Sequence, residues 1–215
     1  MKRRRVKREY DASGRKEAAE RTRVEIQAAA RRLFIARGYR GTTVAEIASE
    51  AGVAVDTVYA SIGTKLSLVR LLVETSISGA DHAIPADERE YVKAIVAEPD
   101  AARKLVLYAQ AVRRIHARLA PLLLVLKDAA SSDDELAEMW KSIATRRATN
   151  MRRFVSDLVA TGSLREDVDH EEAADTIWAT GSPELYLLLT AERGWSPEKF
   201  EDWLARTWIR LLLVQ

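Results

Sequence analysis

The sequence predicts an all-α protein with a small N-terminal helical domain and a larger C-terminal one. Apolar residues recur at helical spacing through most of the 215 residues, and no segment sustains the alternating pattern of a strand. The nine glycines and five prolines fall mostly where these helical patterns end. Hydrophobic residues make up 47% of the chain, which is ample for a packed core and excludes a disordered protein.

The first helix is predicted to begin at Thr22, because Thr22 and Glu25 have the spacing of a capping box. Apolar residues from Ile26 to Phe34 then form one face, and Gly38 marks the end. Residues 1–20 hold six basic side chains in the first eight positions and show little apolar periodicity. We therefore expect residues 1–20 to form a flexible basic arm.

Three shorter patterns follow and predict a helix-turn-helix. Thr43 and Glu46 again have capping-box spacing, and this second helix should end at Gly52. A third helix is expected from about Val55 to Ala60, after a tight turn in which glycine supplies a positive φ. A fourth helix, from Thr64, supports the pair. In this arrangement the second helix of the pair enters the major groove of DNA.

The remaining chain is predicted to be helical after a link at residues 81–87. We expect helices near 87–97, 100–118, 120–130 and 132–161, the last of them opened by a capping box at Ser132 and Glu135. Ser182-Pro183 and Ser196-Pro197 each place serine at the N-cap and proline at the first helical position, which predicts two more helix starts.

The net charge of +2 conceals an asymmetry between the two parts. Residues 1–75 carry 16 basic and 9 acidic side chains, a net charge of +7, and the remaining residues carry a net charge of −5. Such a split indicates that the first part meets a polyanion, although a basic tail beside an ordinary domain gives the same numbers.

Side chains of the predicted helix-turn-helix have chemistry suited to DNA. Thr43 and its backbone N–H groups can hold a phosphate, and Tyr59 offers a hydroxyl. Lys65 opposes the dipole of its helix, so an outside anion explains it better than helix stability does. Asp56 can accept a hydrogen bond from cytosine N4. The structural alternatives are an N-cap for Thr43, a helix-dipole partner for Asp56, and an ordinary tyrosine for Tyr59.

The run from Gly38 to Tyr59 (GYRGTTVAEIASEAGVAVDTVY) closely resembles the DNA-binding domain of TetR-family transcriptional regulators. The resemblance extends back to Ala29 and forward to Leu68, and the all-helical remainder is similar as well. It implies phosphate contacts by Thr43, Tyr59 and Lys65, and base contacts by residues 54–57. Ala60 and Ser61 depart from the family pattern, which has two further large residues there. The candidate DNA-binding residues are Arg3, Arg4, Arg5, Arg40, Thr42, Thr43, Ala54, Val55, Asp56, Thr57, Tyr59, Thr64 and Lys65.

The resemblance also implies a function. It implies a cytoplasmic bacterial homodimer that binds a palindromic operator in double-stranded DNA, in most cases as a repressor released by a small-molecule effector. The corresponding domains are the arm at residues 1–20, the helix-turn-helix domain at 21–66 and the regulatory and dimerisation domain at 67–215. A helical adaptor, or a non-catalytic regulator without a small-molecule ligand, is the alternative.

An effector requires a cavity among the helices of the larger domain. On the helix opened at Ser132, Arg147 interrupts an apolar face and needs a partner. The partner is either an acidic ligand or an internal carboxylate, Asp128 or Glu184, and the internal pair is favoured. His116 and the aromatic residues can equally belong to the core. The candidate ligand-binding residues are Tyr108, Val112, His116, Trp140, Ile143, Arg147, Met151 and Trp178.

The last helix carries a broad, aromatic apolar stripe that predicts a dimer contact shared with residues 170–192. The candidate dimerisation residues are Leu185, Tyr186, Leu189, Phe200, Trp203, Leu204, Thr207, Trp208 and Leu211.

Several function classes are disfavoured by what the sequence lacks. The chain has no cysteine, which excludes a disulfide scaffold, a thiolate metal site and a cysteine nucleophile, and which a reducing cytoplasm permits. It has no Gly-rich phosphate loop and no Gly-x-Ser-x-Gly motif, so we expect no enzyme and no cofactor. Its three histidines lack metal-ligand spacing. No apolar run approaches the roughly 20 residues that span a bilayer, so no membrane partner is expected.

Overall fold

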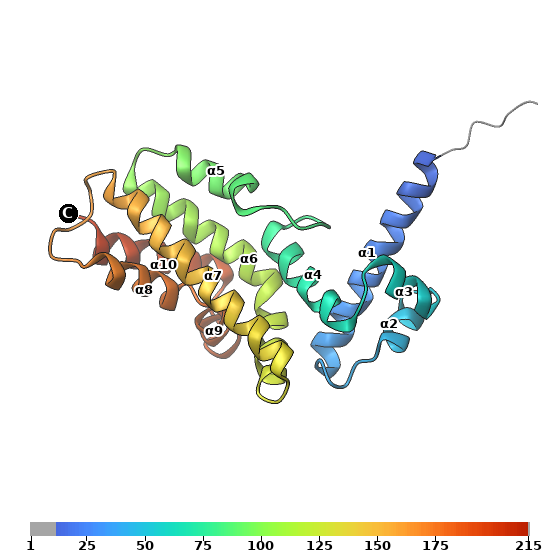
Figure 1. The fold of residues 1–215 in the computed structure, drawn as a ribbon. Coiled ribbons are helices and arrows are strands. Elements are labelled where there is room, and N and C mark those ends of the chain that lie inside the picture. The colour runs from blue at the N-terminus through green and yellow to red at the C-terminus, as the bar shows by residue number, and fades with distance from the viewer. Residues whose placement is uncertain (1–11, 215) are drawn as a thin grey trace, which may run out of the picture.

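The computed structural model describes residues 12–214 and confirms the predicted all-α fold. The described residues hold helices and one isolated bridge between Leu164 and Leu213. Figure 1 shows α1–α4 gathered at one end of the molecule and α5–α10 at the other, with the long helix α6 reaching toward the smaller group. No helix in the described part of the chain is long and apolar enough to cross a membrane.

The smaller group consists of α1 (Ala12–Arg37), α2 (Val44–Glu50), α3 (Val55–Ser61) and α4 (Lys65–Ser78). The predicted starts of α2 and α4 are confirmed. Thr43 accepts a hydrogen bond from the Glu46 amide and forms a complete capping box with the Glu46 side chain. Thr64 caps α4 by accepting a hydrogen bond from the Ser67 amide, at 3.2 Å.

The prediction that the first helix begins at Thr22 is wrong. Helix α1 begins at Ala12, and Thr22 lies in its interior. Residues 12–20 are therefore helical and do not belong to a flexible arm. The cause is composition, because Ala, Arg, Lys and Glu between Ser13 and Thr22 are strong helix formers and extend the helix past the apparent cap. The predicted arm residues Arg3, Arg4 and Arg5 lie outside the described residues.

The larger group contains the longest helix of the described chain, with 30 residues. Its elements in chain order are η1 (Ala86–Glu88), α5 (Glu90–Ala97), α6 (Ala101–Ala130), α7 (Asp134–Val159), α8 (His170–Thr180), α9 (Pro183–Leu187), the π-helical segment η2 (Leu188–Glu192) and α10 (Pro197–Leu212). Ser182 and Ser196 cap α9 and α10 as predicted.

Two predicted boundaries in this group are wrong. Residues 100–118 and 120–130 form one helix, α6, because Pro121 is accommodated inside it. Proline removes one backbone N–H from the helix ladder, but its neighbours Ala120 and Leu122 are buried in the two hydrophobic clusters of the chain. The N-cap of α7 is Asp133 and not Ser132, since the Asp133 carboxylate accepts the Leu136 amide at 3.1 Å.

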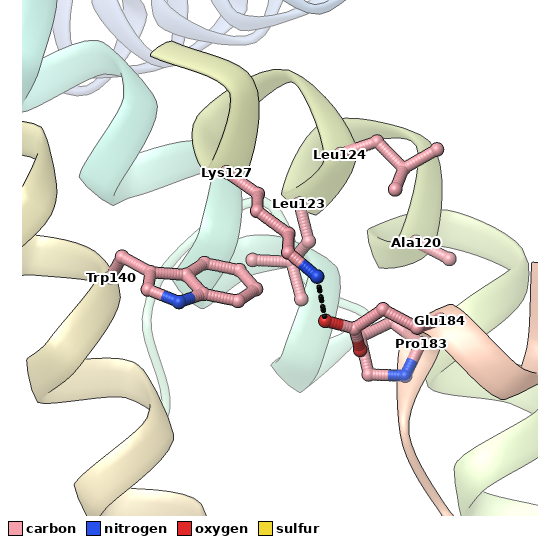
Figure 2. Close-up of a pocket in the computed structure, with 7 residues that line it drawn as sticks. All are labelled: Ala120, Leu123, Leu124, Lys127, Trp140, Pro183 and Glu184. Carbon is pink, nitrogen blue, oxygen red and sulfur yellow. Dashed lines mark hydrogen bonds and ion pairs between the residues drawn. The ribbon is translucent and has the colours of Figure 1, made fainter. Parts of the chain in front are cut away.

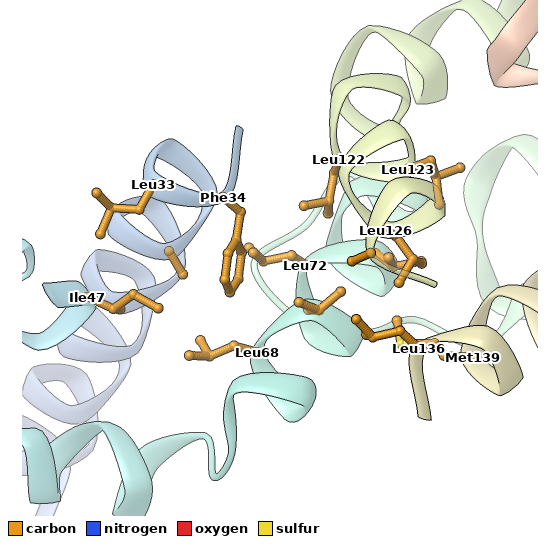
Figure 3. Packing of buried hydrophobic residues seen from close by; sticks show 14 of the residues in the cluster. Leu33, Phe34, Ile47, Leu68, Leu72, Leu122, Leu123, Leu126, Leu136 and Met139 are labelled. Atoms are coloured by element: carbon orange, nitrogen blue, oxygen red, sulfur yellow. The ribbon is translucent and has the colours of Figure 1, made fainter. Parts of the chain in front are cut away.

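One hydrophobic core is shared by the two groups of helices. In Figure 3, buried apolar side chains from α1, α2 and α4 meet buried apolar side chains from α6 and α7. Phe34 on α1 and Leu126 on α6 are almost completely buried in this cluster, which we call the shared core. Its labelled members are Leu33, Phe34, Ile47, Leu68, Leu72, Leu122, Leu123, Leu126, Leu136 and Met139.

Polar contacts reinforce the same junction. Arg31 on α1 donates to the Ser76 hydroxyl of α4 at 3.0 Å and to the backbone carbonyl of Arg118 on α6. Arg118 in turn donates to the Ser76 carbonyl at 3.0 Å. Glu74 on α4 pairs with Arg146 on α7 at 2.7 Å. These contacts fix α1 and α4 against the larger group in one orientation.

A second core fills the larger group and surrounds the backbone carbonyl of Gly181. This carbonyl accepts hydrogen bonds from His116 Nε2 at 2.9 Å and from Arg147 at 3.2 Å. A Cβ at position 181 would lie 2.9 Å from the Ile177 carbonyl and 3.4 Å from the Trp208 ring, so glycine allows this close approach.

The environment of His116 keeps its imidazole neutral. Because Nε2 donates to a carbonyl, the proton of the neutral ring is on Nε2, and the buried Nδ1 has no partner in the described chain. Burial lowers the pKa of His116 to about 4, against the opposing effect of the Gly181 hydrogen bond. Protonation would place an unsatisfied N–H in the core.

The shared core predicts a large cost for truncating Leu126. Leu126 is 1% exposed, whereas Leu124, on the same helix, is 47% exposed. Leu126→Ala should lower the free energy of unfolding by about 2–5 kcal/mol, because it leaves a cavity. Leu124→Ala should cost less than about 1 kcal/mol. Urea unfolding of both variants measures the difference, and equal costs would contradict the packing described.

The neutral state of His116 predicts a loss of stability in mild acid. Its folded-state pKa of about 4 lies below the unfolded value, so the unfolded chain takes up the proton first as the pH falls below about 6.5. The group should contribute about 2 kcal/mol of the stability lost between pH 7 and pH 5.

Urea unfolding at both pH values tests this assignment. His116→Gln, which can still donate to Gly181, should remove that part of the loss. His170→Gln, at an exposed position at the start of α8, should retain it. An identical pH dependence in the wild type and His116→Gln would refute the assignment.

Candidate functional site

Helices α2 and α3 form a tight helix-turn-helix at the end of the molecule farthest from α10 (Figure 1). The turn passes through Gly52, which has a φ of 67° as predicted, and the Val53 amide closes it by donating to the Ala48 carbonyl at 2.9 Å. Ile47 and Ala48 of α2 are buried in the shared core. The turn therefore fixes α3 relative to the core of the molecule.

Helix α3 buries one side chain completely and exposes most of its remaining surface. Val58 is completely buried, whereas Val55 and Tyr59 are 38% and 52% exposed. Ala54 and Asp56 are also exposed, and Thr57 is half-buried. The N-cap residue Ala54 makes no side-chain hydrogen bond, and no hydrogen bond of Asp56 is found in the described chain. The free face of α3 is open to a partner.

Thr43 is the N-cap of α2, which was the structural alternative to a role in phosphate binding. Its hydroxyl lies 2.9 Å from Glu46 Oε2, and its own amide donates to the same oxygen at 2.8 Å. Hydrogen bonds from Thr43 hold the pKa of Glu46 below its usual value. Thr43 remains exposed, so capping leaves its surface available.

Lys65 lies over an aromatic ring that the sequence reasoning missed. Its ammonium is 4.0 Å from the ring centroid of Tyr39, which stacks on Phe34 with centroids 5.7 Å apart. Partial burial lowers the pKa of Lys65, while Asp133 and Glu46 oppose that shift. Tyr39 lies two residues beyond the end of α1, directly after Gly38. The available signal was an aromatic residue next to the glycine that ends the helix. The ring holds the ammonium beside α3.

Three further predicted contact residues have partners inside the chain. Thr42 is completely buried and donates to the Gly38 carbonyl at 2.9 Å, so its assignment to the DNA-binding surface is wrong. Arg40 is exposed but donates to the Ser132 carbonyl of the larger group at 2.9 Å. Thr64 is exposed and caps α4.

A pocket of about 80 Å³ lies among α6, α7, α8 and α9. It contains four predicted ligand-binding residues, namely Trp140, Ile143, Arg147 and Trp178, and four that were missed, namely Leu123, Ala144, Pro183 and Glu184. Figure 2 shows the adjoining hollow, where Lys127 of α6 pairs with Glu184 at 3.0 Å beside the Trp140 ring. Leu123, Pro183 and Glu184 come from α6 and α9, whose approach to α7 no sequence spacing reveals, whereas Ala144 lies on α7 itself.

The other predicted ligand-binding residues belong to the core. Tyr108 stacks on Trp208 with centroids 5.5 Å apart and donates to the Met151 sulfur at 3.3 Å. Val112, His116 and Met151 are buried, and none of these four lines the pocket. The apolar stripe that faces this pocket continues into the packed interior, and the assignment of these four residues to a ligand site stays a prediction.

The favoured internal carboxylate partner of Arg147 is not found. Arg147 donates to the carbonyls of Trp178, at 2.8 Å, and Gly181, at the end of α8. Asp128 and Glu184 form no ion pair with it, since Glu184 pairs with Lys127. Burial lowers the pKa of Arg147, and more distant Glu184 opposes that shift.

Several residues expected at a dimer contact are covered by their own chain. Tyr186, Phe200, Leu204 and Trp208 are at most 6% exposed, so they pack inside one protomer and their assignment as contact residues is wrong. Leu211 is 48% exposed and, of the other candidates, Leu185, Leu189, Trp203 and Thr207 are half-buried.

Among residues 12–214, no group of three or more acidic or histidine side chains is arranged to hold a metal ion.

Comparison with known proteins identifies the family of this site. A model described as bacterial regulatory proteins, tetR family, matches residues 26–72. The transcriptional regulator TtgR of Pseudomonas putida is 29% identical over 167 residues, which cover 76% of this chain and 78% of that protein.

Solved structures share the fold of nearly the whole chain. The repressor NalD of Pseudomonas aeruginosa has a TM-score of 0.70 at 21% identity and covers 92% of this chain and 98% of its own. A complex of SmeT with triclosan has a TM-score of 0.66 at 18% identity and covers 90% of this chain and 92% of its own.

The matched residues contain all of α2 and α3 and the parts of α1 and α4 that hold them. Over residues 26–72 the chain therefore matches the tetR family of bacterial regulatory proteins, and most of its length is similar to the transcriptional regulator TtgR.

Proposed function

We propose that this DNA-binding regulator is a repressor that binds a palindromic operator as a homodimer and is released by a small-molecule effector. The observation that carries the proposal is the exposed face of α3, which is held by Val58 and flanked by the ring-supported ammonium of Lys65. The repressor NalD and the triclosan-bound SmeT share its fold and support the analogy.

In this proposal α3 enters the major groove. Ala54, Val55, Asp56 and Thr57 face base edges, with Asp56 accepting a hydrogen bond from cytosine N4. Thr43, Tyr59 and Lys65 contact phosphates, which position the helix without reading sequence. Arg40 and Thr64 lie beside these contacts, and residues 21–66 form the DNA-binding domain.

A dimer brings two such helices to one operator. The exposed side chains of Leu188 and Leu211, 45% and 48% exposed, belong to the last elements of the chain and supply apolar surface for a second copy. Two-fold symmetry would separate the two recognition helices by about 34 Å, one turn of DNA. Such a regulator acts in the cytoplasm, where bacterial DNA is found.

An effector in the pocket would act through the shared core. Leu123 and Ile143 line the pocket and are also buried members of the shared core, in contact with the helices that carry α3. Cores are close-packed, so a ligand that moves these side chains must shift their neighbours. We infer that occupancy of the pocket and the position of α3 are linked in this way.

A mobility-shift titration with the DNA upstream of the protein's own gene tests the proposed function. A specific shift at moderate salt, lost on competition with the same fragment but not with unrelated DNA, is expected. Equal competition by unrelated DNA would contradict operator binding.

Removing the ammonium of Lys65 should weaken binding to all DNA sequences and reduce its salt dependence. Lys65→Ala should lower the slope of log K against log salt by about one, because one phosphate contact is lost. Lys141→Ala removes the same charge from an exposed site on α7 and should leave the slope unchanged. An unchanged slope in Lys65→Ala would contradict the phosphate assignment.

Truncating Tyr59 should have a similarly uniform effect without changing the slope. Tyr59→Ala should weaken operator and unrelated DNA alike by roughly 10- to 150-fold, since a hydrogen bond to a charged group is lost. Tyr59→Phe keeps the ring and should reproduce most of the loss. A loss confined to the operator would show that Tyr59 reads a base.

A further inference from the structure

The pocket contains a guanidinium whose charge is not matched by a carboxylate. Arg147 uses one terminal nitrogen for its two carbonyl acceptors, and no partner of Nε or of the other terminal nitrogen is found in the described chain. An arginine side chain has five N–H donors in a planar fork that matches a carboxylate. Donors therefore remain available on the side chain that lines the pocket.

The neighbouring charges leave this guanidinium positive. Glu184 is the acidic residue of the pocket lining, and it pairs with Lys127 at 3.0 Å. Hydrogen bonding and the positive field of Lys127 and Arg147 hold the pKa of Glu184 below its usual value in spite of its burial. The three side chains together carry one net positive charge, which a monoanion would balance.

The residues that line the pocket favour a ligand with a flat, apolar part. The cavity is lined by the aromatic residues Trp140 and Trp178 and by the aliphatic residues Leu123 and Ile143. The indole N–H of Trp178 is buried without an acceptor in the described chain, although indole donors are normally paired when buried. A ligand oxygen would satisfy it.

We propose that this pocket binds a small aromatic carboxylate, with the carboxylate on the free donors of Arg147, whose guanidinium lies 5.1 Å from the centroid of the Trp178 ring, and the aromatic ring against the apolar side chains of the lining. The proposal rests on the effector role proposed above and names the ligand class. The cavity of about 80 Å³ exceeds the roughly 10–15 Å³ that one water needs and is below the about 150 Å³ of a cavity known to take benzene. Binding of a ring must therefore move side chains of the lining, because the hollow beside Lys127 (Figure 2) adds no measurable volume.

Calorimetry on the full chain without DNA tests the ligand class. Benzoate should bind at least tenfold more tightly than benzamide, its neutral isostere, and benzylamine should bind more weakly still. Absence of benzoate binding, or equal binding of benzamide, would overturn the proposal. This comparison uses only the wild-type protein, so its outcome does not depend on whether any variant folds.

Substitution of Arg147 tests the residue. Arg147→Gln should lower benzoate affinity at least tenfold and abolish the preference over benzamide. Arg147→Lys keeps the charge without the fork and should retain an intermediate affinity. Arg153→Gln removes one charge from an exposed position on the same helix and should change nothing. Equal affinity in Arg147→Gln and Arg153→Gln would overturn the assignment, and circular dichroism checks that each variant is folded.

The operator assay separates this proposal from the proposed function. Calorimetric binding of benzoate that leaves operator affinity unchanged would support the carboxylate site and contradict release by an effector there. Operator binding without any benzoate binding would support the DNA-binding role and overturn the carboxylate site.

Discussion

The structure depends on the apolar junction at which α1 and α4 pack against the C-terminal half of α6 and the start of α7. Helices as short as α2 and α3 are marginal alone, because seven residues barely exceed a helix nucleus. Their buried side chains, Ile47 and Val58, belong to the same cluster as Leu126. The position of α3, the proposed recognition helix, therefore depends on packing against the larger group of helices.

That junction also explains how a distant cavity can affect DNA binding. The pocket wall and the shared core have Leu123 and Ile143 in common, so no long chain of contacts is required between them. Polar contacts at the same junction, such as Arg31 with Ser76, have discrete geometries that resist small shifts. A packed junction with fixed polar contacts favours a change between two arrangements over a gradual one.

Local signals in the sequence predicted the fold and the helix-turn-helix. Caps at Thr43 and Thr64 and the glycine turn depend on neighbours in the chain, and each was confirmed. Long-range contacts were not predictable. Spacing placed Arg147 on an apolar face but did not show that the end of α8 supplies its acceptors. The apolar stripe on α10 does not reveal which of its side chains are buried within the same protomer. Trp208 was for this reason wrongly assigned to the dimer contact.

Native-state hydrogen exchange across the full chain tests the central claim, that the shared core makes the two groups of helices one cooperative unit. The slowest amides of α2, α3 and α4 should exchange with the same opening free energy as those of α6, because neither group can keep the core without the other. Exchange of α2–α4 through an opening of clearly lower free energy, while α6 stays protected, would contradict the claim.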